Sequence, residues 1–112
     1  MPGRSSSFSG HMRPFHEYPK ISIDELQTEL SSVVKLLYDS MGEYSKVLGD
    51  YERDHIAAYY ESPDDSHAAR TRWADRQTQS LHEDVIIFEQ NIAAYRVLHD
   101  YITNLIQWRI NG

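Results

Sequence analysis

The residues with the clearest potential for chemistry are a glutamate and a histidine three positions apart, Glu52 and His55. On a helix this spacing places both side chains on one face, as in the half-site of di-iron carboxylate bundles. A complete site also needs carboxylates from neighbouring helices, but the segment expected opposite His55, residues 69–73, offers alanine and arginine. We therefore expect His55 to be hydrogen-bonded to an acid or a tyrosine. A di-iron oxidase that uses Glu52 and His55 is kept as a further alternative.

Two other clusters combine histidine with acids, Asp64-x-x-His67 and His82-Glu83-Asp84. Neither has the two histidines four positions apart that a zinc-binding helix uses, and both lie in polar stretches typical of a solvated helix face. The chain also has no Gly-x-Ser-x-Gly motif, no phosphate-binding glycine loop and no cysteine. We predict no catalytic residue, no cofactor and no metal ion, and we interpret the chain as a protein that is not an enzyme.

The composition is that of one folded domain, with 112 residues of which 40% are hydrophobic and 25% charged. A net charge of −6 argues against direct nucleic-acid binding, because phosphate contacts need clustered lysine and arginine. No run of about 18 apolar residues exists to cross a membrane, and the N-terminus lacks the apolar core of a secretory signal. We therefore expect a cytoplasmic protein with no membrane partner.

Residues 1–21 are predicted to form a flexible N-terminal tail that ends in a strap. Residues 1–12 are rich in serine and glycine, which favours disorder. Gly10-His11-Met12 also matches the junction that an expression vector leaves, so the sequence leaves open whether residues 1–12 are native. From Arg13 to Lys20, two prolines push their preceding residues toward extended geometry, and the aromatic residues suggest a strap across an apolar surface.

Residues 22–112 predict an all-α fold, an antiparallel hairpin of two long helices. Ser22 and Glu25 form a capping box, and apolar residues then recur at spacings of three and four, which predicts a first helix over about 23–60. Ser62 as N-cap followed by Pro63 predicts a second helix over about 63–110. The short break between the helices favours antiparallel packing.

Folding the chain back at residue 62 predicts a register for this hairpin. Tyr51 then meets Trp73, and Tyr44 meets Leu81. The apolar stripes of the two helices stay opposite each other along the whole length in this register, and the agreement between the two patterns supports the hairpin.

Both helices carry more apolar residues than one hairpin can bury, which predicts a homodimer that forms a four-helix bundle, with a different protein partner as the alternative. Gly42, Ser45 and Gly49 share one bare helix face, which favours a close helix crossing or a bend, unless the helix simply tolerates its glycines. The predicted oligomer interface consists of Gly42, Ser45, Gly49, Ile87, Ala94, Leu98, Tyr101, Leu105 and Trp108.

The end of the first helix and the turn after it combine tyrosines with acids. The predicted partner surface consists of Asp50, Asp54, Tyr59, Tyr60, Glu61, Asp64 and Asp65. Tyrosine is favoured at protein interfaces, although a solvated helix end has the same composition. The leading hypothesis is a non-enzymatic protein–protein interaction module, an adaptor, inhibitor or assembly factor, whose partners are a second copy and an unidentified protein. The alternative is an acidic inhibitor that imitates nucleic acid and blocks a DNA-binding protein.

The segment Tyr51–Asp75 contains Ala57-Ala58-Tyr59-Tyr60, then Ser62, then Ala68-Ala69-Arg70 and Ala74-Asp75. In this pattern the chain resembles small helical-hairpin proteins of phages and prophages, whose Tyr- and Ala-rich first helix turns at a serine into an Arg/Lys/Ala-rich second helix. The activities of those proteins are mostly undefined, and many are linked to phage replication and recombination. The resemblance implies a helical hairpin and assigns no functional residue.

Overall fold

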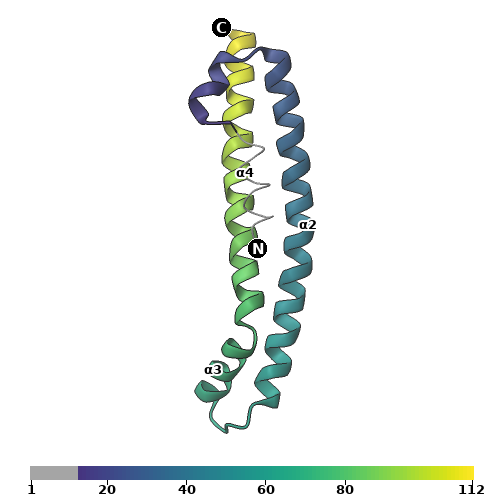
Figure 1. Cartoon of the computed structure of the whole chain (residues 1–112), viewed down its shortest axis with the longest axis vertical. Helices are drawn as coiled ribbons and strands as arrows, with labels where there is room; N and C mark the ends of the chain where they lie inside the picture. The colour runs from purple at the N-terminus through teal and green to yellow at the C-terminus, as the bar shows by residue number, and fades with distance from the viewer. Residues whose placement is uncertain (1–12) are drawn as a thin grey trace. The chain divides into compact units, whose positions relative to one another are not determined.

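The structure is a computed structural model that describes residues 13–112 (Figure 1). In this range the chain forms a short 3-10 helix, η1 (Phe15–Lys20), and three α-helices, α2 (Ile23–Glu61), α3 (His67–Gln77) and α4 (Gln79–Asn111). No strand occurs among these residues, so the all-α prediction is confirmed. The predictions for residues 1–12, a disordered tail and a vector-derived origin, lie outside the described residues.

Helix α2 begins where the capping box predicts. The Ser22 hydroxyl oxygen accepts a hydrogen bond from the Glu25 backbone N–H at 3.1 Å, and the hydroxyl donates to the Glu25 carboxylate at 3.4 Å. Both contacts stabilise the first turn, where free N–H groups and the helix dipole favour a negative charge. The helix ends at Glu61.

The prediction that the next helix starts at Pro63 is wrong, because α3 starts at His67. The Ser62 hydroxyl oxygen accepts the Asp64 N–H at 3.2 Å and so closes a local turn instead of capping a helix. Ser66 is the N-cap of α3, and its hydroxyl oxygen accepts the Ala69 N–H at 3.1 Å.

The predicted continuous second helix is also interrupted, at Thr78 between α3 and α4 (Figure 1). Thr78 is buried, has φ −111° and ψ 15°, and its hydroxyl donates to the Ala74 carbonyl oxygen at 2.7 Å. A threonine hydroxyl bonded to the carbonyl four residues earlier commonly bends a helix. The Thr78 N–H still bonds the same carbonyl at 3.0 Å, so the change is local.

The chain divides into two compact units. Among the described residues, unit 1 comprises 13–37 and 93–112, and unit 2 comprises Tyr38–Ile92. The core of unit 1 joins η1 to the start of α2 and the end of α4. Its buried members are Tyr18, Leu26, Val33, Tyr95, Leu98, Ile102 and Ile106.

In unit 2 the end of α2 contacts α3 and the start of α4, in a register that differs from the prediction. Tyr51 stacks on His82, with ring centroids 5.3 Å apart, instead of meeting Trp73. The Tyr44 hydroxyl donates to Glu89 at 3.2 Å instead of lying opposite Leu81. The register is shifted by about two and a half helical turns, because the connection before α3 is longer than assumed and Thr78 interrupts the helix.

None of the helices in residues 13–112 has a stretch that is both long and apolar enough to cross a lipid bilayer.

Candidate interaction surfaces

One face of α2 within unit 2 is exposed to solvent. It carries three large apolar side chains, Tyr38, Ile56 and Tyr60, which are 71%, 59% and 74% exposed. The face also carries three small residues, and we call the six together the exposed face of α2: Tyr38, Gly42, Ser45, Gly49, Ile56 and Tyr60.

The small residues of this face lie in open space. Gly42, Ser45 and Gly49 are all exposed, and a Cβ atom added at either glycine would meet no neighbouring atom within 4 Å. No contact among residues 13–112 therefore requires a glycine at either position. The sequence predicted these three residues at an interface but missed Ile56, because Ile56 lies one position after His55 and so falls outside the apolar stripe of the first helix.

The predicted interface residues of the second helix have several environments. Ile87 and Trp108 are exposed, and Ala94 is half-buried. The prediction that Leu98 belongs to the oligomer interface is wrong, because Leu98 is 1% exposed and lies inside the core of its own chain. Tyr101 and Leu105 are half-buried and pack against the same core.

A segment of the same chain covers this part of α4, and we call it the strap, residues Arg13–Ile21. The Tyr18 side chain is fully buried in the unit 1 core. The rings of Phe15 and Tyr101 meet edge to face at 5.0 Å, and the Tyr101 hydroxyl donates to the Phe15 carbonyl oxygen at 3.2 Å. The strap thus buries apolar surface that the sequence assigned to a second copy.

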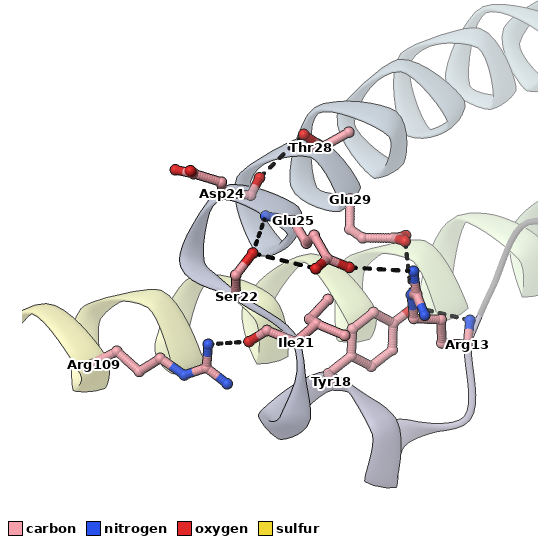
Figure 2. Close-up of polar contacts among 9 residues, drawn as sticks. All are labelled: Arg13, Tyr18, Ile21, Ser22, Asp24, Glu25, Thr28, Glu29 and Arg109. Carbon is pink, nitrogen blue, oxygen red and sulfur yellow. Dashed lines mark hydrogen bonds and ion pairs between the residues drawn. The ribbon is translucent and has the colours of Figure 1, made fainter.

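Polar contacts hold the strap at both ends (Figure 2). At its start, the Arg13 Nε donates to Glu29 at 2.9 Å, and the Arg13 guanidinium lies 3.9 Å from Glu25. The Arg13 N–H also donates to the Tyr18 hydroxyl oxygen at 3.1 Å. At its end, the Arg109 guanidinium from α4 donates to the carbonyl oxygens of Ile21 and Pro19. The sequence indicated the strap through its aromatic residues, but the extended geometry expected before Pro19 is wrong, because Tyr18 and Pro19 lie in η1. No sequence pattern pointed to Arg109.

Hydrogen bonding and burial raise the pKa of three groups in unit 1. The hydrogen bond to Glu29, together with the nearby carboxylates and against the effect of burial, raises the pKa of Arg13. Burial raises the pKa of Tyr18 above the ordinary 10.0, although the hydrogen bond from the Arg13 N–H partly opposes the rise. Burial also raises the pKa of Tyr95. At neutral pH these groups therefore keep their usual charges, and the strap contacts stay formed.

Around the end of α2, part of the predicted acidic surface is neutralised within the chain. The Arg53 guanidinium lies 3.3 Å from Asp50 and 3.1 Å from Asp54. Glu61, Asp64 and Asp65 are exposed, and their side chains form no ion pair among the described residues. One guanidinium balances only one of the two aspartates. The uncompensated acids of the predicted surface therefore lie at the end of α2 and in the turn that follows it, which is a small area for imitating the phosphates of nucleic acid.

The two tyrosines of the predicted partner surface differ in their environment. The Tyr59 hydroxyl is 2.8 Å from His67 Nδ1, and the Arg70 guanidinium lies 5.7 Å from the Tyr59 ring centroid. Tyr59 is thereby fixed against α3. Tyr60 meets only the edge of the Tyr59 ring, at 5.2 Å, and remains exposed.

A shallow groove of about 290 Å³ lies between α2 and α3. Its lining residues are Asp54, Ala57, Ala58, Glu61, Trp73, Gln77 and Thr78. Two carboxylates stand on its rim, so the groove suits a positively charged group better than an anionic one.

The proposed di-iron half-site has a different geometry from the one it would need. His55 Nε2 bonds Asp75 Oδ1 at 2.8 Å, which agrees with the expectation of an acid partner. The acid comes from α3, while Glu52 is exposed. Among residues 13–112, no three His, Cys, Asp or Glu side chains are grouped closely enough to hold a metal ion.

No protein-family model, no curated protein and no solved structure matches this chain. The resemblance to phage helical-hairpin proteins therefore rests on the residues between Tyr51 and Asp75 alone.

Proposed function

We propose that this chain is a non-enzymatic protein–protein interaction module, an adaptor, inhibitor or assembly factor, that works as a homodimer. In this proposal its long helices fold back as an antiparallel hairpin, and two hairpins assemble into a bundle of four helices.

The observation that carries the proposal is the exposed face of α2. Tyr38, Ile56 and Tyr60 leave most of their surface in water, although burying a side chain of this size contributes roughly 1.5–3 kcal/mol. Large apolar residues aligned on one helix face are typical of a contact with another protein. The strap already covers the apolar stripe of α4 near Tyr101. Ile87, Val97 and Trp108 stay exposed on α4, but we assign the contact to α2 because its exposed apolar side chains share one face with small residues.

A matched pair of substitutions tests the location of this contact. Ile56 on α2 and Val97 on α4 are both 59% exposed, so replacing either with glutamate should leave the fold intact. We expect Ile56→Glu to be a monomer at concentrations where Val97→Glu and the unchanged protein are dimers, because only Ile56→Glu places a charge in the contact.

Light scattering coupled to size exclusion measures the three masses, and circular dichroism checks that both variants stay helical. A dimeric Ile56→Glu variant, or a monomeric Val97→Glu variant, would contradict the assignment of the contact to α2.

A further inference from the structure

Four residues of the exposed face of α2 are arranged in symmetric pairs about Gly49, whereas Ser45 has Arg53, outside this set, as its counterpart. Gly42 and Ile56 each lie seven residues from Gly49, one on either side. Tyr38 and Tyr60 each lie eleven residues from it. When two identical helices pack antiparallel around a two-fold axis at Gly49, each of these residues faces its counterpart at the same distance on the other copy.

The counterparts fit each other in size. The Ile56 side chain projects from the helix, and Gly42 leaves open space where a Cβ atom would meet nothing within 4 Å. At the axis the two Gly49 residues allow the backbones to approach closely, as small residues do at helix crossings. A parallel pair would instead place Ile56 on Ile56 and Tyr38 on Tyr38, and would leave the glycines facing each other across a gap.

From this pattern we infer that two copies pair through α2 in an antiparallel arrangement with the two-fold axis at Gly49. In it, Ile56 of each copy packs against Gly42 of the other, and Tyr38 packs against Tyr60. The inference rests on the proposed homodimer and specifies its geometry.

Polar residues at the edges of the face agree with this arrangement. Lys46 and Glu52 each lie three residues from Gly49, so the Lys46 ammonium of one copy lies at the level of the Glu52 carboxylate of the other. Asp50 is not the partner of Lys46, because it already pairs with Arg53 of its own chain. Ser45, Lys46 and Glu52 are exposed in the single chain, and Lys46 has no ion pair among the described residues. The arrangement therefore brings Lys46 of each copy to the level of an opposite charge on the other.

Disulfide trapping tests the geometry directly, because the chain has no cysteine of its own. Two single variants, Gly42→Cys and Ile56→Cys, are mixed as full chains and oxidised. We expect a cross-linked dimer from the mixture, since a disulfide needs Cα atoms within about 7 Å. Neither variant should cross-link alone, because two copies of the same position would then be roughly 21 Å apart along the helices. Gly49→Cys should cross-link by itself.

Val97→Cys mixed with Gly42→Cys is the control for random collisions, and its yield of cross-linked dimer sets the background. Efficient cross-linking of Gly42→Cys by itself would mean parallel pairing and would overturn the inference. The inference would also be overturned if the Gly42→Cys and Ile56→Cys mixture gave no more cross-linked dimer than this control. Light scattering on the unoxidised samples separates the homodimer from its geometry. If cross-linking fails but the samples are dimers, the homodimer is supported and the antiparallel geometry is wrong. If the samples are monomers, both are wrong.

Discussion

Leu98 and Val97 are neighbours in α4, yet one is 1% exposed and the other 59%. Leu98 packs with Tyr18 of the strap and Ile102 of α4 in the core of unit 1. At the scale of single residues, then, the strap and α4 stabilise each other through side chains that are almost completely removed from water. A change at Leu98 acts on the folding of each chain, whereas a change at Val97 acts on its surface.

We expect Leu98→Ala to lower the free energy of unfolding by about 2–5 kcal/mol, because the lost contacts leave a cavity in the core. Val97→Ala is the matched control and should change it by no more than about 0.5 kcal/mol. Urea unfolding followed by circular dichroism measures both values. Equal values for the two variants would show that Leu98 is not in the core.

The buried tyrosines of unit 1 predict a loss of stability at alkaline pH. Because burial raises the pKa of Tyr18 in the folded chain, the unfolded chain, with a pKa near 10.0, releases its proton first. The stabilising contribution is therefore complete below pH 10.0 and is lost as the pH rises through the folded-state pKa. Tyr18→Phe removes this group, so its free energy of unfolding should fall less between about pH 9 and pH 11 than that of the unchanged protein. Equal falls in urea titrations at the two pH values would contradict the role assigned to Tyr18.

At the scale of elements, the strap is a short segment that is held largely by side chains from other elements. Arg109 at the end of α4 donates to two of its backbone carbonyl oxygens, and Glu29 of α2 accepts from its first residue, Arg13. Hydrogen bonds that involve a charged group contribute about 1.5–3 kcal/mol each when they are well formed. The attachment of the strap should therefore depend strongly on one residue, Arg109.

We expect Arg109→Gln to loosen the strap without unfolding the helices. Cleavage by trypsin after Lys20 should become roughly 5- to 30-fold faster, the change expected for a loss of 1–2 kcal/mol. Arg96→Gln is the control, since Arg96 is an exposed arginine of α4 without an ion pair among the described residues. Mass spectrometry of the early fragments measures the rates. Equal rates for the two variants would contradict the clamp by Arg109.

The sequence predicts some of these elements better than others, for physical reasons. The capping box at Ser22 and Glu25 uses residues that are close in sequence, so the start of α2 could be read directly. Ser62 and Ser66 are both good N-caps, and only the local turn that Ser62 forms decides between them. The break at Thr78 depends on one hydroxyl bond in a buried position, which no periodicity indicates. Leu98 was assigned to a dimer because the sequence does not show that the strap folds over α4.

At the scale of the whole molecule, the chain closes one apolar surface with its own strap and leaves another, the exposed face of α2, in water. The symmetric positions of Gly42 and Ile56 about Gly49 suit a second copy of the same chain. Self-association through α2 is thus the central claim, and the cross-linking and substitution experiments above depend on it.

The mass of the unchanged full chain in solution tests this claim most directly. Light scattering coupled to size exclusion, at two protein concentrations, compares it with the 13.1 kDa of one chain. We predict a mass of twice that value at the higher concentration, with dissociation on dilution only if the contact is weak. A mass of 13.1 kDa at both concentrations would contradict the homodimer and would assign the exposed face of α2 to a different protein.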